Sequence, residues 1–250
     1  MKKYNLEFIS DEDFYNHVNE TVKKYRFSID LSEFNLNIID PIKLTFDSKI
    51  YKLGVEEVIE REIGRQIDKS NTNHIGYFHQ NIFNYIGKKD GWSVPERGYD
   101  VVNSEKKVFV EMKNKHNTMN SSSSQKTYMR MLNTLTQDTH STCMLVEVIA
   151  KRTQNVPWVI SLDGERVKNE KIRRVSIDKF YEIVTGDKFA FRKICEALPF
   201  VLSDVMSEVK SNSNSNTVLS ELSAHSPVLL KSLYLLAFRE YEGFQDLNIQ

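Results

Sequence analysis

The chain has 250 residues, of which 40% are hydrophobic and 27% are charged, so it is long enough to bury a real hydrophobic core. This composition excludes collagen-like, mostly disordered and multi-pass membrane proteins. No stretch approaches the roughly eighteen consecutive apolar residues of a membrane span, and no apolar segment follows the basic start, so we expect neither a transmembrane helix nor a signal peptide. The two isolated cysteines, Cys143 and Cys195, exclude a disulfide scaffold and a cysteine-rich zinc site and suit a reducing cytoplasm.

The 34 basic and 34 acidic residues cancel, so there is no chain-wide basic bias toward nucleic acid. Their distribution is uneven. Residues 1–62 carry 13 acids and 9 bases, whereas residues 105–131 carry six bases and two acids, and residues 151–174 carry seven bases and three acids. A basic middle is compatible with DNA contacts, but on charge by itself the ordinary explanation, solvated surface charge, is favoured.

The first third of the chain has helical patterns. Ser10, followed by three acids, is a suitable N-cap for a helix within the first 26 residues. Residues 27–53 are mixed. Apolar spacing then predicts helices over about 55–68 and 73–86, with Gly87 closing the second of them.

The middle of the chain changes to strand patterns. Residues 99–113 are typical of a β-hairpin, and residues 121–137 of a helix with a capping box that begins at Ser122. The nearly continuous apolar run 143–150 predicts a buried central strand, and residues 156–162 a second short strand.

The last part is predicted to be mostly helical, with a flexible Ser/Asn-rich loop at 211–216 before a final helix at about 227–241. There is no internal repeat and no convincing domain boundary. We therefore expect a single α/β domain over 1–250, with a central mixed β-sheet flanked by helices, a core at about 55–162 and a helical C-terminal part at about 177–245.

The hairpin sorts its side chains into an apolar face and a polar face. A turn centred between Ser104 and Glu105 places Val101 opposite Val108. One face is then apolar, and the other presents two carboxylates and a lysine. In this register Asp100 and Glu111 are diagonal neighbours about 7 Å apart. The polar face consists of Asp100, Phe109, Glu111 and Lys113.

Two carboxylates that share a face repel each other and need a cation. A hard, oxygen-binding Mg²⁺ meets this need, and a lysine beside it can act on a metal-bound water and stabilise charge on a phosphate. The pattern Asp100, Glu111, Lys113 thus indicates a metal site for phosphodiester hydrolysis. On the motif by itself, a solvated edge hairpin with a Glu–Lys pair is an equal alternative.

The segment Gly98-Tyr99-Asp100, followed by Val110-Glu111-Met112-Lys113, resembles the catalytic core of the PD-(D/E)XK nucleases. Three longer strings resemble a narrower group, the type II restriction endonucleases that cut GGNCC or GGWCC. These strings are GYFHQ at 76–80, EMKNKHNTMNSSSSQKTY at 111–128 and VEVIAKR at 146–152. The likeness covers about residues 5–240 and departs from the superfamily name at Tyr99, where the name has Pro.

This resemblance implies a restriction-endonuclease-like fold, Mg²⁺-dependent cleavage of double-stranded DNA, a homodimer and a cognate DNA methyltransferase as genetic partner. It also implies roles for four residues. Asp100 and Glu111 would ligate Mg²⁺, the Met112 backbone carbonyl would be a further ligand, and Lys113 would act on the attacking water and the scissile phosphate.

The superfamily often adds a carboxylate from an upstream helix. Glu60 is the first candidate for this metal ligand and Glu57 the second, although a solvated acid on a helix face is the commoner explanation for each. Glu147 is an acid in an otherwise apolar strand. It either assists the metal site or pairs with a base such as Lys151.

Two segments are candidates for DNA contacts. On the helix 121–137, basic and amide side chains recur at helical spacing, and these types suit phosphates and base edges. The polar loop after the catalytic strand is rich in donors and lies near the expected cut. The ordinary alternatives are a polar surface and a flexible loop. The candidates are Asn114, Lys115, His116, Asn117, Lys126, Arg130 and Asn133.

Three functions remain open at this point. The first is a cytoplasmic type II restriction endonuclease, and the second is a repair or recombination nuclease of the same superfamily that reads DNA structure. The third is a non-catalytic DNA-binding protein with a degenerate site. The presence of every expected catalytic residue type counts against the third, and a neighbouring cytosine methyltransferase gene would favour the first.

Overall fold

The computed structural model describes residues 4–37, 39–116, 118–162, 164–208, 215–238 and 247. The chain divides into two compact units. The first comprises residues 1–23 and 75–210, and the second comprises 24–74 and 211–250. The long helix α4 (Val55–Asn81) contributes residues to both. The single endonuclease domain over 1–250 stays a prediction.

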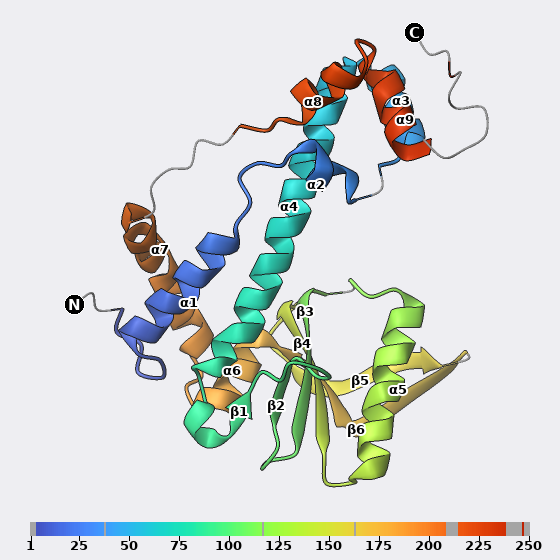
Figure 1. The fold of residues 1–250 in the computed structure, drawn as a ribbon. Helices are drawn as coiled ribbons and strands as arrows, with labels where there is room; N and C mark the ends of the chain where they lie inside the picture. Colours follow the sequence, from blue (N-terminus) through green and yellow to red (C-terminus); the bar gives the residue numbers. More distant parts are fainter. Residues whose placement is uncertain are drawn as a thin grey trace. The chain divides into compact units, whose positions relative to one another are not determined.

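The first unit is a mixed α/β structure, as expected (Figure 1). Its described strands form one six-stranded sheet in the order β1-β2-β3-β4-β6-β5. β3 and β6 both run parallel to β4, and the remaining neighbours are antiparallel. The strands are β1 (Trp92–Ser93), β2 (Val101–Asn103), β3 (Val108–Lys115), β4 (Thr142–Ile149), β5 (Asn155–Leu162) and β6 (Glu165–Ser176).

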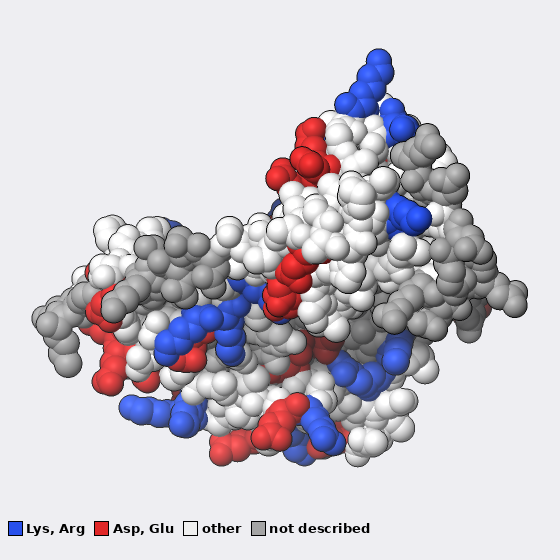
Figure 2. All heavy atoms as spheres, turned by 45° about the horizontal axis from the view of Figure 1, so that its top comes forward, with Lys and Arg blue, Asp and Glu red and all other residues white. Residues whose placement is uncertain are grey.

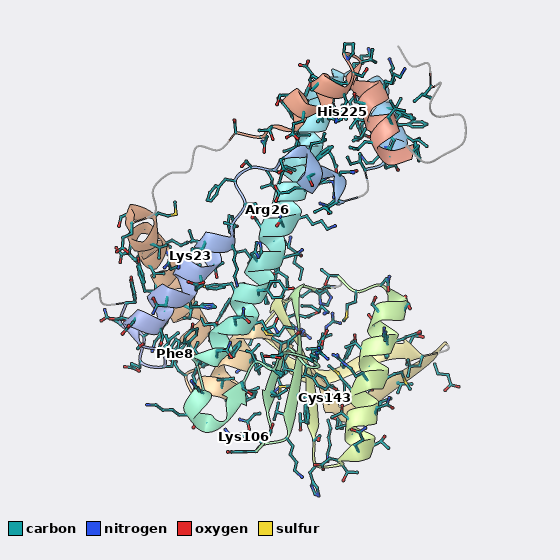
Figure 3. All side chains as sticks on the ribbon, viewed as in Figure 1. Phe8, Lys23, Arg26, Lys106, Cys143 and His225 are labelled. Atoms are coloured by element: carbon teal, nitrogen blue, oxygen red, sulfur yellow. The ribbon has the colours of Figure 1, made fainter. Side chains whose placement is uncertain are left out.

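Helices cover both faces of this sheet. One face packs its apolar residues, Val110 and Val146 among them, against α1 (Asp11–Lys24), α6 (Ile177–Thr185) and α7 (Ala190–Glu208). The other face lies under α5 (Ser121–Gln137), whose Tyr128 and Met131 are fully buried against it. Cys143 marks this second face in Figure 3, and its thiol lies 3.7 Å from the Met131 carbonyl oxygen.

Several predicted elements are confirmed. Ser10 caps α1, because its hydroxyl oxygen accepts the Asp13 N–H at 3.0 Å. The helix 121–137 has the predicted bounds, although Asn120 rather than Ser122 is its N-cap and accepts the Ser123 N–H at 2.8 Å. The predicted strands 143–150 and 156–162 correspond to β4 and β5.

One helix prediction was wrong, and one strand was not predicted. The separate helices over 55–68 and 73–86 are one continuous helix, α4, because the polar stretch between them contains no proline and is compatible with helix. The helical turns 82–84 and 88–90 follow it on either side of Gly87, whose φ of 73° suits glycine. The sequence also gave no sign of β6, since its charged residues hide the strand pattern.

The hairpin register was predicted wrongly by two residues. Val101 pairs with Val110, not with Val108, because the turn contains four residues, Ser104 to Lys107. Lys107 takes a φ of 54°, and the Asn103 side chain accepts the Lys106 N–H at 2.9 Å within this turn. A shift of two residues preserves the side-chain alternation, so the division into an apolar face and a polar face stands.

The second unit is helical and has its own hydrophobic core. Its elements are α2 (Leu31–Asn35), α3 (Pro41–Tyr51), most of α4, α8 (Val218–His225) and α9 (Leu229–Phe238). Phe34, Ile59 and Leu233 are completely buried in it. In the described part of the chain, no helix is long and apolar enough to cross a membrane. Most of the predicted loop 211–216 lies outside the described residues.

Candidate active site

Polar side chains lie close together near the carboxyl ends of the three parallel strands β3, β4 and β6. On the face that α5 covers, β4 alternates from the buried Cys143 and Leu145 to Glu147. In the ladder register, Glu147 is the partner of Lys113 on β3, and Leu145 is the partner of Arg174 on β6. The carboxyl ends of parallel strands are a common place for ligand sites in α/β proteins.

Asp100 lies immediately before β2, where the pairing with β3 becomes irregular. Its N–H donates to the Val110 carbonyl at 2.9 Å, although Val110 is already the register partner of Val101. Two residues thus stand opposite one, which is the pattern of a β-bulge and re-aims the side chain. The Asp100 carboxylate accepts the Met112 N–H at 2.7 Å.

The surroundings of Asp100 make its carboxyl group costlier to ionise than an exposed one. Burial raises the pKa of this carboxyl group, and the nearby Glu111 carboxylate raises it further. The Met112 N–H, Lys113 and Arg130 oppose this effect without cancelling it. A carboxylate that is costly to ionise is one that gains from a nearby cation.

Glu111 accepts a hydrogen bond from a cation at each of its two oxygens. Lys113 Nζ donates to Oε1 at 2.7 Å, and Arg130 Nη2 donates to Oε2. Glu111 and Lys113 are two residues apart on β3 and share a face, whereas Arg130 comes from α5. The side chain of Glu111 is only 13% exposed, so both cations compensate a largely desolvated carboxylate.

Arg130 has two further partners beside Glu111. Its Nη1 donates to the Gly98 carbonyl at 3.3 Å, and its guanidinium carbon lies 4.5 Å from the centre of the Tyr99 ring. The Tyr99 hydroxyl is 2.8 Å from the Thr134 hydroxyl of α5, and burial raises its pKa to about 12. The Tyr99 ring therefore packs against the Arg130 guanidinium group and helps to fix its position.

Glu147 lies in a second cluster beside the first. Its carboxylate is 2% exposed and lies 3.0 Å from His116 Nδ1, and Arg174 Nη2 donates to it as well. Burial by itself would raise the pKa of Glu147, but the hydrogen bonds from Arg174 and His116 outweigh it and hold this pKa below its usual value. Of the two alternatives for Glu147, the structure therefore shows pairing with bases, and these are His116 and Arg174 rather than Lys151.

The predicted DNA-contacting residues fall into different environments. Lys115, Lys126 and Asn133 are exposed, as such contacts require. Asn114 is half-buried and, by strand alternation, belongs to the apolar face. Arg130 contacts the Glu111 carboxylate, and His116 contacts the Glu147 carboxylate. Asn117 lies outside the described residues.

The donor set of the first cluster suits a hard cation. Asp100 and Glu111 supply carboxylate oxygens. The N–H and the carbonyl of a strand residue point to the same edge of the strand. Because the Met112 N–H donates to Asp100, the Met112 carbonyl also points toward the side on which Asp100 lies. Among the described residues, no third His, Cys, Asp or Glu joins a metal-binding group. Glu60 and Glu57 are exposed residues of the second unit, and their role as metal ligands stays a prediction.

Sequence reasoning missed two residues of this region. Gln80, at the end of α4, donates from Nε2 to the Asp100 carbonyl at 3.2 Å and so helps to hold the start of β2. Its only signal was its place in the string GYFHQ. Arg174 was counted merely as part of a basic segment, because β6 itself was not recognised.

Charges are mixed over the face of the molecule in view in Figure 2, where acidic and basic side chains alternate among the described residues. This agrees with the net charge of zero. The described part of that face has no continuous basic surface.

The chain is similar to known restriction enzymes over most of its length. The family model for the Eco47II restriction endonuclease matches residues 6–207. The type II restriction enzyme Sau96I of Staphylococcus aureus is 32% identical over 212 residues, which are 80% of each chain. The type II restriction enzyme Eco47II of Escherichia coli is 32% identical over 217 residues, 81% of this chain and 89% of that enzyme. The chain therefore belongs to the Eco47II restriction endonuclease family and is a type II site-specific deoxyribonuclease.

Proposed function

We propose that this enzyme is a PD-(D/E)XK nuclease that hydrolyses both strands of DNA at GGNCC or GGWCC with Mg²⁺ as its cofactor. The observation that carries the proposal is the meeting of Asp100, Glu111 and Lys113 at the end of β3, with the Asp100 carboxylate on the Met112 N–H. The sequence strings around these residues support the choice of target site.

Each residue has a distinct task in this proposal. Asp100, Glu111 and the Met112 carbonyl would hold Mg²⁺, which when bound would supply an activated water and neutralise charge on the phosphate. Lys113 holds its ammonium group beside Glu111, where it is placed to orient the attacking water and to stabilise the developing negative charge. The two exposed cations Lys115 and Lys126 bind phosphates away from the cut and fix the position of the DNA.

The biological setting follows from the target. A palindromic site is read most simply by a two-fold symmetric homodimer. An enzyme that cuts such a short sequence also requires a cognate methyltransferase that protects the host DNA, and we place both proteins in the cytoplasm.

A digest of a plasmid of known sequence tests the proposal. With Mg²⁺, run-off sequencing of the products should place every end within GGNCC or GGWCC, and EDTA should abolish cleavage. Ends at another fixed sequence would refute the target but not the chemistry. Cleavage without any fixed sequence would instead favour a nuclease that reads DNA structure, and full activity in EDTA would refute the metal site.

A further inference from the structure

Arg130 is the one residue of the first cluster that does not come from the catalytic hairpin. It reaches Glu111 Oε2 from α5 and is also held by the Gly98 carbonyl and the Tyr99 ring. Its side chain is 42% exposed, against 32% for Lys113 and 13% for Glu111. Of the two cations on Glu111, Arg130 therefore has the freer path to water.

The charges of the cluster balance without a metal. With both carboxyl groups ionised, Asp100 and Glu111 contribute two negative charges, and Lys113 and Arg130 contribute two positive charges. A divalent cation bound to the same carboxylates would leave two uncompensated positive charges in a partly buried site. The repulsion between such an ion and a guanidinium group on the same carboxylate is large at these short separations.

Lys113 is poorly suited to leave the Glu111 carboxylate when a metal ion binds there. It lies on the same strand as Glu111, two residues away, and among the described residues its ammonium group has no hydrogen-bond or ion-pair partner besides Glu111. Arg130 is longer and retains the Gly98 carbonyl and the Tyr99 ring when it gives up Glu111. The carboxylate can therefore exchange Arg130 for a metal ion without releasing the guanidinium from the edge of the site.

We propose that Arg130 is a displaceable counter-ion of the active site, which occupies Glu111 in the metal-free enzyme and yields this carboxylate when a divalent cation binds. This inference rests on the proposed function, because it requires that Glu111 is a metal ligand. It assigns Arg130 to control of metal binding, whereas the sequence pattern had assigned it to the DNA backbone.

The proposal predicts that removing a positive charge improves metal binding. In a calorimetric titration of the full-length protein with Mg²⁺ and, separately, Mn²⁺, without DNA, Arg130→Ala should bind the metal about tenfold more tightly or better. Arg130→Gln, which removes the charge but retains a polar donor, should show the same gain. Arg130→Lys, which retains the charge, should bind like the wild type.

Lys126→Ala is the matched control, because it removes one positive charge from the same helix one turn away, where Lys126 is exposed. Its metal affinity should stay within about twofold of the wild type, since exposed charges are strongly screened. Thermal melting without metal shows whether each variant is folded, and if Arg130→Ala is not, the comparison of Arg130→Gln with Arg130→Lys decides.

Two results would overturn the inference. Metal binding by Arg130→Ala and Arg130→Gln that is unchanged or weaker would show that Arg130 supports Glu111 instead of competing for it. An equal gain for Lys126→Ala would show a general charge effect. A different result addresses the proposed function: if Glu111→Gln binds the metal as the wild type does, the metal site itself is wrong.

Discussion

Lys113 contacts Glu111, whereas other lysines of the same region are exposed. Substitutions of the two kinds of lysine should therefore affect cleavage and DNA binding differently. Lys113→Ala removes the ammonium group beside Glu111, so we expect cleavage to fall about 10³-fold while specific DNA binding changes less than about tenfold. Single-turnover cleavage and gel-shift assays on one oligonucleotide measure both quantities.

Lys126→Ala provides the opposite case, because Lys126 is exposed on α5. This variant should bind DNA more weakly, and its DNA affinity should depend less steeply on salt concentration. Its cleavage rate at saturating protein concentration should stay close to that of the wild type. If Lys113→Ala cuts at nearly the wild-type rate, the hairpin carboxylates are a surface charge cluster and the catalytic assignment is wrong.

The ionised Asp100 carboxylate is predicted to lower the free energy of unfolding of the metal-free protein. Burial raises its pKa, so the native state binds this proton more tightly than the unfolded chain does. Stability is therefore lost as pH rises through the interval between the unfolded and native pKa values, and the full penalty is present above that interval. Asp100→Asn removes the charge but still offers an oxygen to the Met112 N–H.

In EDTA at pH 7, Asp100→Asn should thus melt at a higher temperature than the wild type, by about 2–4 °C for each kcal/mol regained. The difference should shrink as the pH is lowered toward about 4, the usual pKa of Asp. Glu111→Gln serves as comparison, because it loses two ion pairs and should not gain stability. A lower melting temperature for Asp100→Asn at pH 7 would contradict the argument.

At the scale of elements, the cluster of Glu147, His116 and Arg174 links the ends of β3, β4 and β6. Glu147→Ala leaves both bases without this buried carboxylate. We expect a loss of about 2–3 kcal/mol in the free energy of unfolding, less than for a fully buried pair because Arg174 retains access to water. Urea denaturation at pH 7 measures this loss.

The pH dependence of this loss has a definite sign. Because the pKa of Glu147 is held below its usual value, its contribution is present above the unfolded pKa and disappears as pH falls through the native one. The gap in unfolding free energy between the wild type and Glu147→Gln should therefore narrow in acid. A gap that is constant from neutral to acidic pH would mean that packing, and not the ionised carboxylate, holds the three strands.

At the scale of the whole molecule, the expected target imposes symmetry. Two identical half-sites are most simply bound by two copies of one chain, related by a two-fold axis. Light scattering should give the mass of a dimer, about twice 29.2 kDa, for the free protein or for its complex with a duplex that contains the site. A monomer under both conditions would refute the homodimer.

The sequence determined the elements whose signals are local. Side-chain alternation in 99–113 defined an apolar face and a polar face, and this division survived an error of two residues in the register. The helix 121–137 and the strand within 143–150 were also found from local signals, the helix from its capping residues and apolar stripe and the strand from its nearly continuous apolar run. Asp100, Glu111 and Lys113 were chosen as catalytic candidates because they share one face of one hairpin, and their catalytic role stays a prediction.

Only the tertiary structure decided which residues from distant segments meet. Arg130 carried no mark that distinguished it from Lys126 on the same helix, yet one binds Glu111 and the other is exposed. Arg174 was hidden in a charged strand, and its pairing with Glu147 depends on the parallel contact of β6 with β4. Such pairs join residues 19 and 27 positions apart, and no local period encodes which side chains the packing of α5 and β6 brings to a carboxylate.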